Sequence, residues 1–382
     1  MTADAVGGVY SYALALAHGL AARGVRVALA TMGPRPSPAQ RAEARTIPGL
    51  QLVESDFRLE WMDDPWDDVR RAGDWLLALE ERLRPDVVHL NGYVHAALPW
   101  RRRPVVVAHS CNVSWWWDVK GAPPPPRYDR YRQAVAAGLR AAAVVVAPTR
   151  AMLGALARHY GFRPGRAGAP SARVIANGVD PAGFAVAPKE PFILAAGRLW
   201  DEAKNVAVLD QVATELPWPV AVAGDARHPS GGDRAPKAVR LLGWLPPHEL
   251  RGVMARAGIY ALPARYEPFG LSAVEAALSG CPLVLGDIES LREVWGQAAA
   301  YVPPDDPAAL GRVLRAVCEQ PEERARLARA ARQRARSYGI APMVAAYLEL
   351  YGMCGRLEPS NRDGGRGGRA ARPVSSPDHP HL

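Results

Sequence analysis

The sequence predicts an α/β protein of two domains, each built on a parallel sheet. The chain has 382 residues, which is too long for one compact α/β core and suits two domains. Amphipathic helical segments alternate with short apolar strands, and this alternation is typical of parallel sheets. The alternation forms two series, which are separated by a short segment punctuated by proline.

The first series predicts an N-terminal Rossmann-like domain over residues 1–180. A helix is predicted over 9–20, because its apolar residues share one face and Gly24 follows it. Strands are predicted at 25–30, 86–90 and 104–108, with a further helix at 69–83 that stops before Pro85.

The second series predicts a C-terminal Rossmann-like domain over residues 191–337. Its strands are expected at 192–196, 220–223, 259–262 and 282–285. Residues 181–190 form the expected linker, and a last apolar helix, 342–354, is expected to join the N-terminal domain. The tail, 355–382, is rich in Gly, Arg, Pro and Ser and is predicted to be disordered.

The first strand of the N-terminal domain is predicted to be shortened or missing. A doubly wound domain opens with a buried strand, but here only residues 1–6 precede Gly7 and Gly8. Either the strand is shortened to about 2–5, or the native chain begins upstream, which is the favoured hypothesis. An intact mass that matches a chain starting at Met1 would contradict truncation.

Composition excludes several classes of protein. The chain is 49% hydrophobic and 22% charged, as soluble globular proteins are, and no apolar run reaches the roughly 18 residues of a membrane span. No signal peptide is recognisable, so we expect a cytoplasmic protein. The four cysteines lack the spacing of a zinc site or a disulfide framework. They are interpreted as packing residues or exposed thiols.

The net charge of +9 suits an anionic partner, which could be nucleic acid, an acidic lipid surface or a phosphorylated small molecule. Nucleic acid is disfavoured, because the arginines are spread along the chain and no nucleic-acid-binding motif is present.

Gly7 and Gly8 stand where a strand would hand over to a helix. Residues without side chains let backbone N–H groups at a helix start approach a phosphate. A tight turn without a ligand is an equally good interpretation of two glycines.

A second candidate loop follows the predicted strand 192–196 and carries Arg198 and Lys204. Ligands bind at the carboxyl ends of strands in open α/β sheets, where two cations would neutralise a diphosphate and stabilise it as a leaving group. In the alternative, Arg198 pairs with Asp201 or Glu202 and Lys204 is only solvated.

A third loop leads from Glu267 into a helix that is expected to begin near Gly270 and to carry Glu275. The free N–H groups and the dipole of this helix form an anion site. Paired glutamates also occur in glycosidases, but eight residues of helix span about 12 Å, beyond the roughly 5 to 9.5 Å that hydrolysis uses. Alternatively, Glu275 is an ordinary helix carboxylate.

Together these features resemble the retaining glycosyltransferase family 4, whose GT-B fold has two facing Rossmann-like domains. The resemblance extends from about residue 4 to 353 and depends most on the E-x7-E spacing of Glu267 and Glu275. The segment V-I-A-N-G-V-D at 174–180 is the next most specific element.

The resemblance implies a binding site for a nucleotide-sugar donor. Its residues would be Gly7, Gly8, Arg198, Lys204, Glu267, Phe269, Gly270, Leu271 and Glu275, and those acting in catalysis would be Glu267, His109, Arg198 and Lys204. Glu275 would hold the ribose hydroxyls, and Glu267 would contact the sugar. Amides of Gly8 and of 269–271 would help the two cations to grip the diphosphate, and His109 would face the sugar, although a histidine at a strand end is more often structural.

The implied reaction transfers a hexose with retention at the anomeric carbon and requires neither metal nor cofactor. Positioning and stabilisation of the leaving group then account for catalysis. The acidic pairs at 63–64 and 67–68 flank a predicted helix start, where carboxylates favour the dipole, so we do not interpret them as metal ligands.

The acceptor, a sugar, lipid or small molecule, is expected on loops of the N-terminal domain. Trp115, Trp116 and Trp117 offer flat faces for stacking on a sugar, or they form a hydrophobic plug. The arginines at 101–103 and 127–132 either contact an anionic membrane, as some family members with lipid acceptors do, or form a solvated face. Rival hypotheses are a nucleotide-sugar epimerase on the same fold, an inactive or truncated sugar-nucleotide binder and, more remotely, a nucleic-acid binder.

Overall fold

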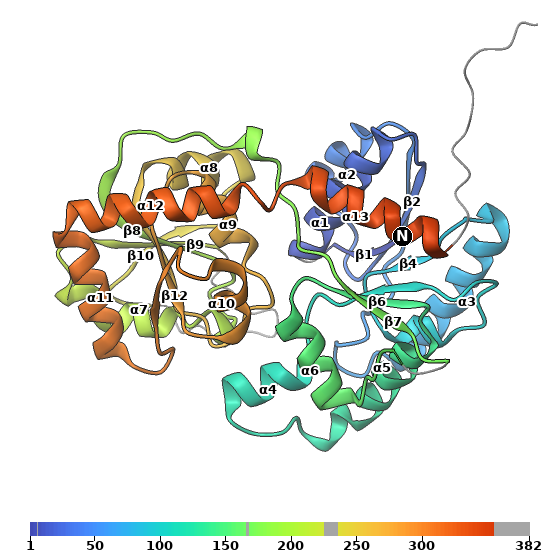
Figure 1. Ribbon diagram of the computed structural model, residues 1–382. Helices are drawn as coiled ribbons and strands as arrows, with labels where there is room; N and C mark the ends of the chain where they lie inside the picture. The colour runs from blue at the N-terminus through green and yellow to red at the C-terminus, as the bar shows by residue number, and fades with distance from the viewer. Residues whose placement is uncertain (6, 166–167, 225–235, 355–382) are drawn as a thin grey trace, which may run out of the picture.

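The computed structural model shows two α/β lobes and describes residues 1–5, 7–165, 168–224 and 236–354 (Figure 1). The tail predicted to be disordered, 355–382, lies outside these residues. Within the described part of the chain, every helix is too short or too polar to cross a bilayer.

The N-terminal lobe contains two parallel sheets that meet at their first strands. One sheet has the order β1–β2–β3, and the other has β4–β5–β6–β7. The strands are β1 (Thr2–Asp4), β2 (Val27–Met32), β3 (Leu50–Glu54), β4 (His89–Leu90), β5 (Val105–Val107), β6 (Val144–Ala147) and β7 (Ser171–Val174). Asn91 joins them, because its backbone N–H donates to Thr2 Oγ1 at 3.0 Å and its side-chain amide donates to the Thr2 carbonyl at 2.7 Å. The strand order across the lobe therefore reverses between β1 and β4.

Helices cover both faces of these sheets. They are α1 (Gly8–Ala21), α2 (Pro38–Arg45), α3 (Trp66–Leu83), α4 (Asn112–Lys120), α5 (Asp129–Ala141) and α6 (Arg150–Tyr160), with short 3-10 helices η1 (Val94–Ala97) and η2 (Pro126–Tyr128). The last helix of the chain, α13 (Ile340–Cys354), returns to this lobe and packs on α1. The Tyr12 hydroxyl donates to that of Tyr347 at 2.5 Å in the buried contact between them.

The C-terminal lobe has one six-stranded parallel sheet in the order β10–β9–β8–β11–β12–β13. Its strands are β8 (Glu190–Ala196), β9 (Val220–Ala223), β10 (Arg240–Gly243), β11 (Ala257–Leu262), β12 (Leu283–Gly286) and β13 (Ala300–Val302). Its helices are α7 (Val206–Val212), α8 (Pro247–Arg256), α9 (Leu271–Leu278), α10 (Glu289–Trp295), α11 (Pro307–Glu319) and α12 (Pro321–Ala335), with 3-10 helices η4 (Glu202–Lys204) and η5 (Ala213–Glu215). Here the order reverses between β8 and β11.

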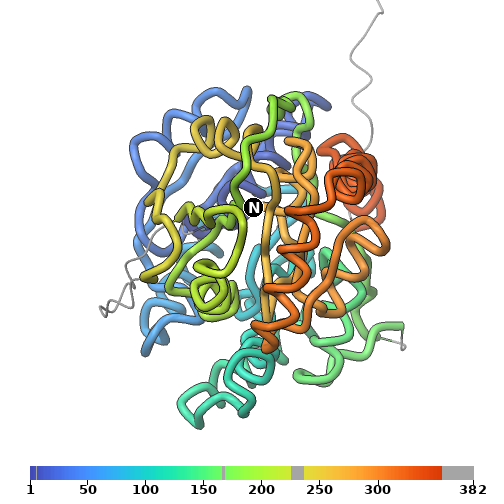
Figure 2. Tube along the Cα trace, turned by 90° about the vertical axis from the view of Figure 1, so that its left-hand side faces the viewer, coloured from blue at the N-terminus to red at the C-terminus, as the bar shows by residue number. Residues whose placement is uncertain are grey.

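The chain crosses between the lobes twice, and the two crossings lie side by side. The linker leads through η3 (Pro181–Gly183) to β8, and the segment after α12 returns to α13 (Figure 1). Val179 bridges to Gly339, and its N–H donates to the Tyr338 carbonyl at 2.9 Å. Seen from the side of the C-terminal lobe, α13, at the red end of the colour scale, lies at the right of the molecule (Figure 2).

The predicted fold class is confirmed: the protein is α/β, with two Rossmann-like lobes and parallel sheets. The first strand is shortened rather than missing, since β1 contains three residues and pairs with β2. Four predicted strand starts are wrong by two or three residues. The strands predicted at 25–30 and 86–90 begin later, at Val27 and His89, and those predicted at 192–196 and 259–262 begin earlier, at Glu190 and Ala257. Apolar residues precede the two strands that begin later than predicted, so hydrophobicity alone does not mark where these strands begin.

We expect Gly178→Val to lower the free energy of unfolding by roughly 1–3 kcal/mol, as overpacking in a core does. A Cβ at this buried glycine would lie 2.6 Å from the Gly339 carbonyl oxygen and 2.8 Å from the Ile340 Cα, which are backbone atoms of the second crossing. Gly154→Ala, in α6 with open space around it, is the control and should gain up to about 1 kcal/mol. Denaturant unfolding measures both, and an unchanged Gly178→Val protein would contradict the packing argument.

Candidate functional site

The strand-order reversal in the C-terminal lobe brings the predicted donor residues together. Arg198 and Lys204 lie in the loop after β8, and Glu267 lies in the loop after β11. Because β8 and β11 are neighbours, both loops leave the same edge of the sheet side by side. Residues 63 positions apart in sequence, Lys204 and Glu267, form an ion pair there.

Arg198 faces the glycine turn of the other lobe. Its guanidinium pairs with Asp201 at 2.9 Å and stacks over the Trp200 ring at 5.0 Å. A methyl group added at Gly7 would lie 3.9 Å from Arg198 Nη1. The pairing with Asp201, foreseen as an alternative, is present, and the side chain still remains 45% exposed. Arg198 can therefore contact a ligand as well as its carboxylate partner.

Lys204 is not merely solvated, so that alternative is wrong. Its side chain is 19% exposed and that of Glu267 is 11% exposed. The second carboxylate oxygen of Glu267 accepts N–H groups from Gly270 at 2.9 Å and Phe269 at 3.3 Å. The sequence could not show that this carboxylate folds back onto its own loop, because the loop conformation decides which oxygen meets which donor.

Because Glu267 folds back onto its own loop, two of the amides that were predicted to bind the diphosphate already have a hydrogen-bond partner. The N–H groups of Phe269 and Gly270 are engaged by Glu267. Gly270 adopts a left-handed conformation at φ 86° and directly precedes α9. Within the described residues, no hydrogen bond is seen from the N–H of Leu271 or Ser272, the first two of that helix. These amides and the helix dipole remain for an anion.

Glu275 lies on α9, one turn further from the loop, and is partly buried. Burial raises its pKa to about 7, and the charge of Arg251 from α8 works in the opposite direction. A carboxylate with this pKa exchanges its proton near neutrality, where it can accept hydrogen bonds from hydroxyl groups in its ionised form.

In the N-terminal lobe, Gly7 has φ 83° and ψ −147°, a conformation that L side chains rarely adopt. Gly8 begins α1, and a side chain there would meet open space. The turn therefore places the N-terminus of a 14-residue helix close to Arg198.

His109 follows β5 and lines a cavity of about 80 Å³ together with Asp4, Glu60 and Asn91. Its Nε2 lies 2.8 Å from Asn91 Oδ1, and its ring meets the edge of Tyr12 with centroids 4.6 Å apart. Burial lowers the pKa of His109 to about 4. The imidazole is therefore neutral at physiological pH.

Glu60 was missed from the sequence, where it stands in a loop without a recognisable motif. Its carboxylate accepts the backbone N–H groups of Tyr93 at 3.1 Å and Val94 at 3.0 Å, at the start of η1. Burial raises its pKa, against the lowering by these donors and by His95. The carboxyl group of Glu60 therefore lines the same cavity as His109.

The three tryptophans predicted on a loop lie instead on α4. The helix forms because Cys111 Sγ accepts the N–H of Ser114 at its start and Gly121, at φ 64°, ends it. Trp115 Nε1 donates to Asp201 at 3.3 Å, so this residue contacts the loop after β8, which carries Arg198 and Lys204. Trp116 packs edge-on against Trp115, whereas Trp117 is 46% exposed. Stacking of an acceptor on these rings stays a prediction.

Further hydrogen bonds hold α4 and α6 to the C-terminal lobe. Lys120 pairs with Glu202 at 2.7 Å, and the Cys111 N–H donates to the Tyr266 hydroxyl at 2.5 Å. The Glu293 carboxylate accepts the N–H groups of Arg150 and Ala151 at the start of α6. None of these contacts can be predicted from a sequence motif, because each of them joins segments far apart in the chain.

The acidic residues at 63–68 lie where the sequence predicted, around the start of α3, with Asp67 and Asp68 in its first turn. Among the residues that the structure describes, no three His, Cys, Asp or Glu side chains gather as they would around a metal ion. The predicted independence of metal stays a prediction.

Two family models match the chain in succession. The model described as Glycosyltransferase Family 4 matches residues 6–182, and that described as Glycosyl transferases group 1 matches residues 180–334. The chain belongs to glycosyltransferase family 4. The boundary between the two matches falls at the crossing between the lobes.

Curated relatives match this family 4 chain over part of its length. A glycogen synthase of Mycobacterium tuberculosis is 35% identical over 190 residues, which are 45% of each chain. A D-inositol 3-phosphate glycosyltransferase of Xylanimonas cellulosilytica is 34% identical over 190 residues, or 44% of each. The matched stretch thus spans less than half the length of these relatives.

Solved structures share the fold over nearly the whole family 4 chain. A sucrose-phosphate synthase from Thermosynechococcus elongatus superimposes with a TM-score of 0.75 at 18% identity, covering 91% of this chain and 93% of its own. The Anabaena protein HepE in complex with UDP-glucose gives 0.71 at 17% identity, covering 91% and 96%. These similarities establish the GT-B fold.

We expect Glu275→Gln to raise the free energy of unfolding by about 1–3 kcal/mol at about pH 8 and to leave it unchanged at about pH 4. The folded-state pKa of Glu275 is raised to about 7 from an ordinary value of 4.5. Below the unfolded pKa both states are protonated. As the pH rises through the interval between the two values, the unfolded state releases its proton first, so the wild-type protein loses stability that the variant keeps.

Denaturant unfolding at both pH values measures this difference. The matched control is Glu249→Gln on α8, whose carboxylate is 54% exposed. If Glu275→Gln raised the free energy of unfolding equally at the two pH values, the raised pKa of Glu275 would be contradicted.

Proposed function

We propose that the protein is a retaining glycosyltransferase that moves a hexose from a nucleotide-diphosphate sugar to a hydroxyl-bearing acceptor. The supporting observation is the approach of Arg198, from one lobe, to the glycine turn at Gly7, from the other. A diphosphate between them would meet a guanidinium on one side and the N-terminus of α1 on the other.

The same arrangement would supply the chemistry of the leaving group. Negative charge develops on the diphosphate as the bond to the anomeric carbon breaks. Arg198, Lys204 and the first amides of α9 surround this position with positive charge, so we propose that no metal is required. The acceptor oxygen then forms the new bond on the face that the diphosphate leaves, and its proton passes to the departing diphosphate.

Glu275 and Glu267 are proposed to bind the two ends of the donor. Glu275 is an acceptor for ribose hydroxyls beside α9. Glu267, held by Lys204 and Gly270, would contact sugar hydroxyls without freedom to move. This rigidity suits positioning. Among the described residues, nothing favours an epimerase or a non-catalytic binder.

The acceptor is proposed to bind on the N-terminal side, beside the cavity that His109 and Glu60 line. A peripheral membrane contact through the arginines of 101–103 and 127–132 remains a proposal. Residues 101–103 are exposed, whereas Arg130 stacks on Trp66 and Arg132 pairs with Asp129. Equal pelleting with neutral and acidic liposomes would contradict this contact.

Release of nucleotide from UDP-, GDP- and ADP-sugars in the presence of EDTA tests the proposal. UDP-glucose is the first donor to try, because HepE was solved with it. We expect one donor to be turned over and Arg198→Ala to lower kcat about 10²- to 10³-fold, as the loss of one leaving-group or oxyanion donor does.

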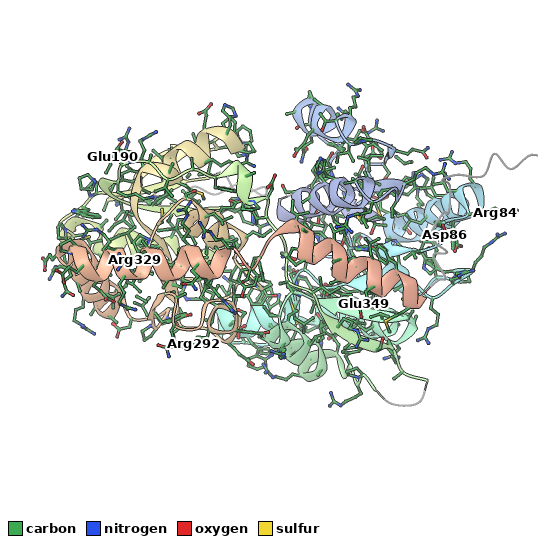
Figure 3. The ribbon with its side chains drawn as sticks, turned by 45° about the horizontal axis from the view of Figure 1, so that its top comes forward. Arg84, Asp86, Glu190, Arg292, Arg329 and Glu349 are labelled. Carbon is green, nitrogen blue, oxygen red and sulfur yellow. The ribbon has the colours of Figure 1, made fainter. Side chains whose placement is uncertain are left out.

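Arg292→Ala is the matched control, since Arg292 also pairs with an aspartate, Asp287, and stacks on an aromatic ring, Tyr301. It lies on α10 at the outer edge of its lobe (Figure 3), and its loss should leave kcat unchanged. If the folded protein neither bound nor turned over any donor, the enzyme assignment would fail.

A further inference from the structure

Two histidines converge on a single amide oxygen at the strand-order reversal of the N-terminal lobe. Asn91 follows β4, and its Oδ1 lies 2.8 Å from His109 Nε2 and 3.1 Å from His89 Nε2. The orientation of the amide is fixed, because its NH₂ group donates to the Thr2 carbonyl at 2.7 Å. The oxygen therefore faces both rings.

This geometry determines which ring nitrogens carry protons. An amide oxygen only accepts hydrogen bonds, so Nε2 must be the donor in both rings. A neutral imidazole has one N–H, which leaves Nδ1 unprotonated in each. For His89 the remaining nitrogen is satisfied, since the Tyr351 hydroxyl of α13 lies 2.6 Å from Nδ1 and donates to it.

His109 differs from His89 at this second nitrogen. Within the described residues, no hydrogen-bond partner is found for its Nδ1, and the residue lines the cavity beside the glycine turn. Burial, which lowers its pKa to about 4, keeps the ring neutral. The atom left for a substrate is thus a lone pair and not an N–H.

We propose that Asn91 is a positioning residue that holds His109 as the Nε2–H tautomer, so that His109 accepts a hydrogen bond from a substrate hydroxyl through Nδ1. The part that concerns substrate rests on the proposed function, whereas the tautomer does not. A substrate without a hydroxyl at this place would leave the lone pair unpaired and bind less tightly.

Other groups around His109 do not replace Asn91 in this role. Tyr12 of α1 meets the ring edge-on and gives its proton to Tyr347. The charged and titratable groups that line the same cavity are Asp4, Arg58, Glu60, Tyr93, His95 and Tyr131. Among the described contacts, the hydrogen-bond partner of the His109 ring is Asn91.

Two-bond ¹H–¹⁵N correlation spectra of the full chain labelled in histidine test the tautomer in the wild-type protein. The resonances are assigned with His109→Gln and His89→Gln. We expect His109 to show a protonated Nε2 and an unprotonated Nδ1, while His248, which is 80% exposed, serves as the reference for an exposed ring. A His109 protonated at Nδ1, or averaged between tautomers, would overturn the proposal.

Asn91→Asp tests the role in the reaction. A carboxylate in place of the amide would favour the imidazolium and raise the pKa of His109 from about 4 by roughly 1 to 3. Nucleotide release from UDP-glucose, or from the donor found to be active, should then fall up to tenfold between about pH 8 and about pH 6 in the variant. Because Glu275, with a pKa of about 7, titrates over the same interval in both proteins, the decrease caused by Asn91→Asp is measured as the ratio of variant to wild-type release, which stays constant if Asn91 does not set the state of His109.

Thr2→Val is the matched control. It removes the hydroxyl that accepts the Asn91 N–H and so weakens the same contact between β1 and β4 without changing the side chain of Asn91. A merely structural Asn91 predicts that both variants lose stability and share one pH profile, which would contradict the proposal. If the wild type released no nucleotide at all, the proposed function would fail while the spectra still tested the tautomer.

Discussion

The site depends on one constraint of parallel sheets: in each lobe the strand order reverses beside the first strand. Successive crossovers are right-handed, so the connections on the two sides of the first strand diverge and leave a crevice at the carboxyl ends. The loops at β8 and β11 bring Arg198 and Glu267 to one crevice, and β1 and β4 bring Gly7 and Asn91 to the other. The proposed donor site lies where Arg198 of one crevice approaches Gly7 of the other.

The ion pairs of Lys204 and Arg198 determine which of these two side chains is available to contact a ligand. Lys204 and Glu267 are mostly buried, and a buried charge that loses its partner is costly, so this pair holds the loop in shape. Arg198 is more exposed and shares its guanidinium between Asp201 and the Trp200 ring. A diphosphate would therefore exchange partners mainly with Arg198, while Lys204 adds a fixed positive charge nearby.

Contacts between the lobes connect α4, on the proposed acceptor side, to the loop after β8, where the donor is proposed to bind. Asp201 accepts from Arg198 and from Trp115 of the opposite lobe, so the position of α4 bears directly on the arginine. The crossings at Gly178 and Gly339 pack backbone against backbone. The lobes thus meet at the two packed crossings and, across the site, through the Lys120–Glu202 ion pair and hydrogen bonds of α4 and α6 to the C-terminal lobe.

The sequence by itself determined the two-lobed α/β fold, the glycine turn and the residues of the basic and acidic loops. These features are local, since hydrophobic periodicity and turn residues act over a few neighbours. Only the tertiary structure decided that Glu267 holds two of the expected amides, that α4 is a helix and that Glu60 and Asn91 line a cavity with His109. Each of these depends on which distant segment supplies the partner of a polar group, and no short stretch of sequence contains that information.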